Sequence, residues 1–288
     1  MFRVISTAIA AICLSASPSL AQRDFSAVNI TVTEVSDGIF MMNGAGGNMG
    51  LSVGDDGAFL VDDQFAPLSD KIVAAIKTVT DSPVEFVLNT HHHGDHTGGN
   101  EAFGDTGAYI VAHDNVRSRL LARDGTADAA LPVITFSKSA TFHRNGEEIH
   151  VFHPANAHTD GDAIVMFRNA NVVHMGDVFF SGMYPFIDVG SGGGINGYID
   201  ALETTAAMID DDTKVIPGHG PLSGKADIVA SIAVLNDVRT RIQALIDQGL
   251  DEDAIVAADP LADLNDQWEW QFISGERMAR AAYQSLVE

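Results

Sequence analysis

Short apolar stretches separated by turn residues follow one another from residue 29 onward. Apolar and polar positions alternate or form brief apolar runs, and glycine-containing turns such as Ser36-Asp37-Gly38 separate them. This pattern predicts a meander of short antiparallel strands. The expected strands cover residues 29–35, 39–42, 49–53 and 58–61, and the glycine-rich segment 44–50 is expected to be a loop.

The pattern changes to alternating helices and strands after residue 64. Apolar residues recur at helical spacing from Leu68 to Val79, and Pro83 ends that helix before a buried strand at 84–88. Further strands are expected at 109–112, 149–152, 163–167, 172–175 and 214–216, and further helices at 114–122, 198–209, 228–245 and around 268–286. Strands followed by helices in each half predict one α+β domain over residues 22–288, with two facing sheets and helices outside.

The first 21 residues have the features of a secretory signal peptide. Arg3 supplies a short positive region, residues 4–14 are apolar, and Ser19-Leu20-Ala21 is a small-residue cleavage pattern. The apolar run is too short to span a bilayer. We therefore predict cleavage after Ala21 and a periplasmic or secreted mature protein.

Charge and cysteine content limit the possible functions. The net charge is −23, and it becomes −24 when Arg3 is removed. Such a surface repels nucleic acid and anionic membranes, so we expect the partner to be a small molecule. We also expect a monomer. Cys13 is the only cysteine and lies in the predicted signal peptide. The mature chain therefore offers neither a disulfide nor a thiolate metal ligand.

The most concentrated candidate chemistry is the segment His91–His96, which has the sequence HHHGDH and follows the strand at 84–88. Alternate side chains of an extended segment point to one side, and Gly94 permits a turn that brings the later residues back. Imidazole and carboxylate groups bind Zn²⁺ and also Fe or Mn. The candidate ligands are His91, His93, Asp95 and His96. A chance His-rich surface loop is the alternative.

Three later strand ends each carry one more residue of the kind that binds metals. These residues are His158, Asp177 and His219. Taken singly, each is typical of a turn or a helix cap. Taken together with His91–His96, they indicate a metal site assembled from several strand ends.

The motif His91-x-His93-x-Asp95-His96, with His158, Asp177 and His219 downstream, resembles the metallo-β-lactamase superfamily over nearly the whole mature chain. The resemblance implies a four-layer αββα sandwich with two Zn²⁺ ions at one edge of its sheets. It assigns His91, His93 and His158 to the first ion, Asp95, His96 and His219 to the second, and Asp177 to a position between the two. His92 is not expected to be a ligand.

The resemblance also implies metal-assisted hydrolysis. A hydroxide shared by the two ions would be the nucleophile, one ion would polarise the substrate carbonyl, and Asp95 would orient the hydroxide. The expected enzyme is β-lactamase-like and opens an amide ring, with a broad substrate range and weak β-lactam turnover. Fe or Mn remains an alternative to Zn²⁺.

Two departures from the dedicated β-lactamases favour a more general hydrolase. Asp177 stands where those enzymes have a cysteine, and it resembles the residue found in glyoxalase II-like enzymes and lactonases. Residues 178–213 also contain no Lys or Arg to bind a substrate carboxylate, so only Ser181, Tyr184 or Asn196 would offer a hydrogen bond there. Hydrolysis of a lactone, a phosphoester or a thioester at the same site is therefore the alternative activity.

Two further function classes stay open at this point. Some relatives use iron in redox reactions, although those that transfer electrons carry a flavin domain for which this chain has no room. A non-catalytic metal-binding protein of the same fold is the other class. All seven expected ligands are present, which favours an enzyme.

The substrate pocket is expected to lie between the segments 44–50 and 179–194. The first would be a mobile flap with Met42 and Met49 as an apolar wall, whereas Met41 is expected in the core. Aromatic residues of the second would line the pocket. Trp268 and Trp270 are expected to pack within the last helix, and Asp62 or Asp63 is a candidate to support a histidine ligand, a turn role being the alternative.

Overall fold

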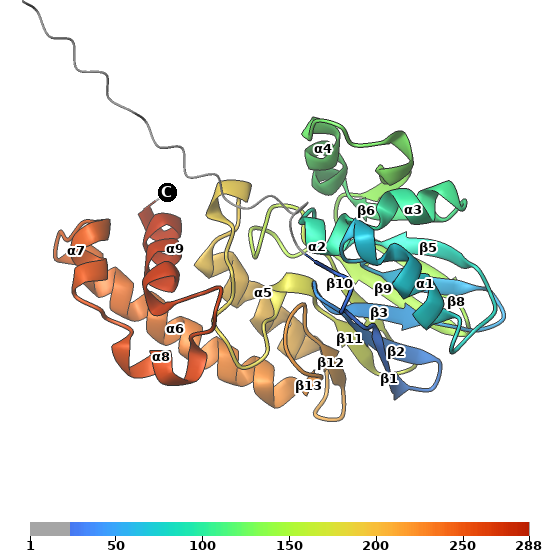
Figure 1. Cartoon of the computed structure of the whole chain (residues 1–288). Coiled ribbons are helices and arrows are strands. Elements are labelled where there is room, and N and C mark those ends of the chain that lie inside the picture. Colours follow the sequence, from blue (N-terminus) through green and yellow to red (C-terminus); the bar gives the residue numbers. More distant parts are fainter. Residues whose placement is uncertain (1–23, 288) are drawn as a thin grey trace, which may run out of the picture.

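The computed structural model describes residues 24–287, in which two β-sheets face each other (Figure 1). The predicted signal peptide lies outside these residues. The first sheet has the order β1 (Thr31–Ser36), β2 (Ile39–Asn43), β3 (Met49–Ser52), β4 (Ala58–Val61), β5 (Val84–Leu88), β6 (Tyr109–His113) and β7 (Ile134–Phe136). The second has the order β13 (Ser223–Gly224), β12 (Lys214–Ile216), β11 (Val172–His174), β10 (Ile164–Phe167), β9 (Glu147–Phe152) and β8 (Ser139–Arg144).

The direction of the strands determines where the loops gather. Strands β1 to β4 pair antiparallel, which confirms the predicted meander. Strands β4 to β7 then run parallel, as do β11 and β12 in the second sheet. Because the carboxyl ends of parallel strands meet at one edge of a sheet, the segments after β4 and β5 lie together, as do those after β11 and β12.

Helices cover the outer face of each sheet. On the first sheet lie α1 (Ser69–Ile76), α2 (Gly94–Thr97), α3 (Asn100–Asp105) and α4 (Asp114–Ala122). On the second lie α5 (Ile195–Met208) and α6 (Lys225–Asp247), followed by α7 (Glu252–Ala257), α8 (Ala262–Trp268) and α9 (Gly275–Val287). Figure 1 shows α7, α8 and α9 extending away from the sandwich beyond α5 and α6.

Four apolar cores separate these layers, and the smallest, which contains Val116, lies under α4. Neighbouring residues on one strand point to opposite faces of the sheet. Met41 and Val61 accordingly enter the core between the sheets together with Phe167, whereas Leu60 enters the core under α1. A third core joins the second sheet to α5, α6 and α9. The layers are therefore helix, sheet, sheet and helix, and the predicted four-layer αββα sandwich is confirmed.

The C-terminal part differs from its prediction. The expected helix around 268–286 is present as α9, but its predicted beginning is wrong, because α8 ends at Trp268 and α9 begins at Gly275. Glu269 has extended backbone angles, and Trp270 N–H then donates to the carbonyl of Ile273 at 3.1 Å, which forms a turn. Strands β7 and β8 and helix α7 were also not expected, since their segments are short and weakly patterned.

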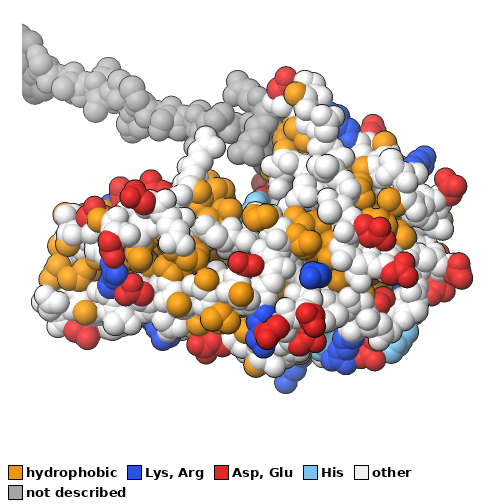
Figure 2. Space-filling view, turned by 90° about the horizontal axis from the view of Figure 1, so that it is seen from below, with side chains coloured by type: hydrophobic (Ala, Val, Ile, Leu, Met, Phe, Trp, Pro, Cys, Tyr) orange, Lys and Arg blue, Asp and Glu red, His pale blue; other side chains and the backbone are white. Residues whose placement is uncertain are grey.

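The acidic residues do not gather at one place on the face drawn in Figure 2. Asp and Glu side chains are spread over this face, with apolar side chains between them, especially over the C-terminal helices. Among residues 24–287, no helix combines the length and the apolar character that a membrane span requires. On this face, therefore, the acidic residues form no single patch that could serve as a binding surface for a basic partner.

Candidate metal centre

Two tight turns, after β5 and β11, position five of the seven candidate ligands. His93 has extended backbone angles and is followed by α2, whose first turn carries Asp95 and His96. Asp177 lies in a 3-10 turn at 176–178 after β11. Gly176 has a φ of +51°, and a Cβ there would lie 2.6 Å from Cβ of Thr90, so this turn requires glycine.

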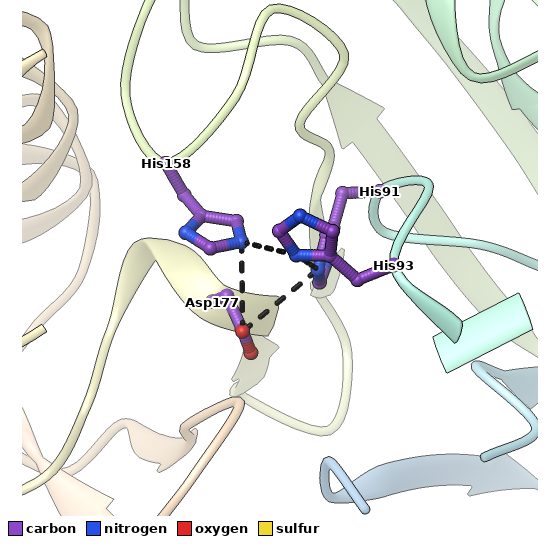
Figure 3. Close-up of side chains that lie close together, drawn as sticks. All are labelled: His91, His93, His158 and Asp177. Atoms are coloured by element: carbon purple, nitrogen blue, oxygen red, sulfur yellow. Dashed lines mark hydrogen bonds and ion pairs between the residues drawn. The ribbon is translucent and has the colours of Figure 1, made fainter. Parts of the chain in front are cut away.

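The first group of ligand atoms comes from three histidines and Asp177 (Figure 3). His93 Nδ1 lies 3.1 Å from His91 Nε2 and 3.0 Å from His158 Nε2. Asp177 Oδ2 lies 3.8 Å from His91 Nε2 and 3.6 Å from His158 Nε2. Figure 3 shows the three rings and the carboxylate pointing toward one another from separate segments of the chain.

The second group contains Asp95, His96 and His219. Asp95 Oδ2 lies 3.8 Å from His96 Nε2 and 3.6 Å from His219 Nε2. The other oxygen of Asp177, Oδ1, lies 3.1 Å from His96 Nε2 and 3.4 Å from His219 Nε2. The Asp177 carboxylate therefore directs one oxygen to each group. All seven residues predicted from the sequence lie in these two groups.

Hydrogen bonds at the outer ring nitrogens leave bare nitrogens facing inward in the first group. Thr90 donates its hydroxyl proton to Asp62 at 2.7 Å, so the same hydroxyl accepts from His91 Nδ1 at 3.1 Å. His158 Nδ1 donates to the carbonyl of Phe186 at 2.7 Å. His93 Nε2 lies 2.9 Å from Asp188 Oδ2 and donates to it. A neutral imidazole that donates from its outer nitrogen has a lone pair on its inward nitrogen, which can bind a metal.

Asp62 supports the second group in the same way. Its Oδ2 lies 2.7 Å from His96 Nδ1, and its Oδ1 accepts the Thr90 N–H at 2.7 Å. Sequence reasoning named Asp62 or Asp63 as the supporting residue, and Asp62 has this contact. Asp63 instead accepts the N–H of Gly99 at 2.8 Å.

Asp188 is a site residue that the sequence prediction missed. It lies in the segment 179–194, which was expected to line the pocket, but no role was assigned to it. Its only local signal is the glycine-rich sequence that follows, in which Asp188 Oδ1 accepts the N–H of Ser191 at 3.2 Å. The partner of the carboxylate, His93, is 95 residues away in the sequence.

Burial and neighbouring charges shift the pKa values of the histidines in different directions. Burial holds the pKa of His91 well below its ordinary value and lowers the pKa of His158 to about 4, so both rings are neutral at pH 7. Burial also acts to lower the pKa of His96, but neighbouring carboxylates, chiefly Asp177, outweigh it and raise that pKa. Burial acts to raise the pKa of Asp177, but the surrounding histidines, His96 first, hold it well below its usual range.

The donor set fits divalent metal ions. His96 Nε2 and Asp177 Oδ1 are buried, and neither has a hydrogen-bond partner among the described residues. Two nitrogens on one tetrahedral zinc lie roughly 3.3 Å apart, close to the spacings of 3.0 and 3.1 Å around His93. Imidazole and carboxylate suit Zn²⁺, Fe or Mn. His92, which was not expected to be a ligand, lies near His93 and Asp188. The latter two residues are already hydrogen-bonded to each other.

A cavity of about 720 Å³ opens onto both groups. Its polar lining comes from ligand residues such as Asp95 and His219, and its remaining walls are largely aromatic. The aromatic residues are Phe65, Phe180, Phe186, Trp270 and Phe272. Neither Lys nor Arg lines this cavity among the described residues, which agrees with the missing cation in residues 178–213.

Several predicted pocket residues lie elsewhere. Met42 and Met49 are fully buried in the core under α1, so the prediction of a methionine wall is wrong, and only Ala45 of the glycine-rich loop lines the cavity. Trp270 lines the cavity although it was expected to pack within a helix. The three proposed hydrogen-bonding residues do not line the cavity either. These are Ser181, Tyr184 and Asn196, which bond to Ser223, Asn265 and Arg239.

The comparison with known families agrees with this geometry. A family model described as the metallo-beta-lactamase superfamily matches residues 42–219. This chain belongs to the metallo-β-lactamase superfamily. The match begins in β2 and ends at His219, so it contains all seven candidate ligands, while α6 to α9 lie outside it.

Relatives within the superfamily act on different bonds. A hydroxyacylglutathione hydrolase from a Polaromonas species is 31% identical over 156 residues, which are 53% of this chain and 55% of that protein. The alpha subunit of a 2,4-dinitroanisole O-demethylase from a Nocardioides species is 28% identical over 156 residues, which are 52% of this chain and 44% of that protein. The chain thus spans about half the length of the curated relatives it matches.

Solved metallo-β-lactamase structures share the fold. One from Pontibacter korlensis has a TM-score of 0.63 and 20% identity, covering 72% of this chain and 99% of that one. DIM-1 metallo-β-lactamase has a TM-score of 0.63 and 18% identity, covering 73% of this chain and 99% of that one. At these identities the likeness shows the fold alone.

The role of Asp62 can be tested by replacing it with asparagine. Asp62→Asn keeps the size of the side chain but removes the negative charge that orients His96. We expect metal affinity to fall about 10- to 100-fold, as for other residues that support a metal ligand. Competition with a chromophoric chelator measures the affinity. Asp212→Asn, at an exposed turn, is the control, and equal affinities in the two variants would contradict this role.

The close approach of Gly218 to Asp177 gives a second test. A Cβ at Gly218 would lie 2.1 Å from Asp177 Oδ1 and 2.5 Å from the backbone carbon of Gly176, so Gly218→Ala must displace the carboxylate and the turn that carries it. We expect metal affinity to fall at least about tenfold. Gly224→Ala is the matched control, since its Cβ meets nothing closer than 3.9 Å. Unchanged metal affinity in Gly218→Ala would contradict a role in metal binding for the Asp177 carboxylate at its position in the structure.

Proposed function

We propose that this protein is a hydrolase that holds two divalent metal ions, with zinc as the preferred metal. The single observation that carries the proposal is the Asp177 carboxylate, whose two oxygens face two separate groups of ligand atoms. His91, His93 and His158 would hold one ion, and Asp95, His96 and His219 would hold the other. Asp177 would contact both. Secretion after cleavage behind Ala21 remains part of the proposal.

Such a pair of ions would polarise a substrate carbonyl and lower the pKa of a bound water to about 7. The residues of the chain would then orient the reactants. Asp95 is 27% exposed and lines the cavity, so its carboxylate is placed to accept a proton from the attacking water. The aromatic walls lower the polarity beside the reacting atoms, which strengthens the electrostatic interactions there.

The cavity favours a neutral acyl substrate. An anionic group bound away from the metal centre would find no Lys or Arg in the lining. A β-lactam and a glutathione thioester both carry carboxylates and would bind without that counter-charge. We therefore place a neutral ester or lactone first. A thioester is the second candidate, because one relative is a hydroxyacylglutathione hydrolase.

A substrate panel on zinc-loaded protein tests this proposal. We expect a neutral aryl ester and a lactone to be hydrolysed with a kcat/KM at least about tenfold above that for nitrocefin or a hydroxyacylglutathione. Removing the metal with a chelator should abolish turnover, and adding zinc should restore it.

The panel also shows how the proposal fails. Fast nitrocefin turnover with no ester or lactone turnover would contradict the preference for a neutral substrate and favour the β-lactamase interpretation. Turnover that survives complete metal removal, or no turnover of any member by the zinc-loaded protein, would contradict a metal-dependent acyl hydrolase. Native protein that contains iron rather than zinc would contradict the choice of metal.

A further inference from the structure

The segment 269–274 joins α8 to α9 and reaches the cavity of the metal centre. Three consecutive residues of this segment, Trp270, Gln271 and Phe272, line that cavity. They lie beyond residues 42–219, the part of the chain that matches the superfamily. One wall of the cavity therefore comes from the loop between two C-terminal helices, outside the part of the chain that carries the metal ligands.

Hydrogen bonds fasten this segment to the loop after β11. The indole N–H of Trp270 donates to the carbonyl of Tyr184 at 2.9 Å, and the N–H of Tyr184 donates to the carbonyl of Trp268 at 2.7 Å. The two segments carry Phe272 and Phe186, whose ring centroids are 5.5 Å apart at 76°. The two loops thus form one continuous wall.

The wall runs from the candidate metal ligands to the mouth of the cavity. Phe186 stacks on His93 with the ring centroids 5.7 Å apart, and Phe180 stacks on His219 at 5.0 Å. Trp270 lies 5.9 Å from Phe180 and 5.7 Å from Phe272, again between centroids. A planar group placed beside the metal centre would therefore meet aromatic faces and edges along its length.

Phe272 is 45% exposed, and Arg277 holds it in place through two contacts. The guanidinium of Arg277 lies over its ring, 4.5 Å from the centroid, and Arg277 Nη1 donates to the carbonyl of Phe272. An ordered aromatic ring left open to solvent at the mouth of a cavity is a typical feature of a binding site for an apolar group.

We propose that Phe186, Trp270 and Phe272 form an aromatic subsite that binds a flat apolar group, such as a phenyl ring, attached next to the scissile bond. Within residues 24–287, neither Lys nor Arg lines the cavity itself, and the guanidinium of Arg277 lies over the ring of Phe272 at its mouth. The apolar group is therefore the main feature that would select the substrate inside the cavity. The proposal rests on the proposed function for the position of the scissile bond. Binding of the apolar group itself can be measured without turnover.

The test compares two neutral amides, phenylacetamide and acetamide, titrated into the full-length protein with its metal and followed by ligand-observed NMR. We expect phenylacetamide to bind at least about tenfold more tightly. Phe272→Ala should raise its Kd about fivefold or more, and Phe272→Leu, which keeps apolar bulk without a flat ring, should give an intermediate value. Tyr109→Ala removes an aromatic ring that is 53% exposed on β6 and serves as the matched control, with no change expected.

Equal affinities for the two amides, or a Phe272→Ala protein with unchanged phenylacetamide affinity and unchanged melting temperature, would overturn the proposal. The outcomes also separate it from the proposed function. A protein that prefers phenylacetamide but hydrolyses no substrate of the panel contradicts the function and supports the subsite. A hydrolase that binds both amides equally contradicts the subsite alone.

Discussion

Three imidazole nitrogens that converge within hydrogen-bonding distance of one another form the constraint on which this site depends. His93 Nδ1 lies 3.0 and 3.1 Å from the nitrogens of His158 and His91. The other nitrogen of each ring already has a hydrogen-bond partner outside the group. The inward nitrogens therefore share one small space, in which a cation can accept a lone pair from each neutral ring. This convergence is the strongest physical argument for a metal.

The fold supplies the rigidity that this arrangement requires. The ligands come from segments at the carboxyl ends of strands in both sheets, so the packing between the sheets sets the distance between the ligand groups. Asp62 after β4 and Asp188 after β11 reach across to His96 and His93 and fix the orientation of the two rings. At Gly218 a Cβ would meet Asp177, so the backbone itself closes around the carboxylate.

The sequence predicted the parts of the molecule whose signals are local. Strand patterning predicted two facing sheets with helices outside. The four layers and the assignment of all seven ligands came from the family resemblance that His91 to His96 and the three later strand ends carry. Asp188 was missed because its contact with His93 spans 95 residues and no pattern marks it. Trp270 was assigned to the last helix, whereas the turn at residues 269–274 depends on tertiary hydrogen bonds to Tyr184. The walls of the cavity are thus less predictable than its metal ligands, because they are defined by contacts between distant loops.

The stoichiometry of zinc binding tests the central claim most directly, namely that Asp177 joins two metal sites. Titration of metal-free protein with zinc, read by calorimetry and checked by elemental analysis, should give two ions per chain. Asp177→Asn, which keeps the shape of the side chain but weakens both contacts, should lower the affinity of both ions together. Binding of a single ion by the unaltered protein, or a loss confined to one ion in the variant, would contradict a carboxylate shared between two metals.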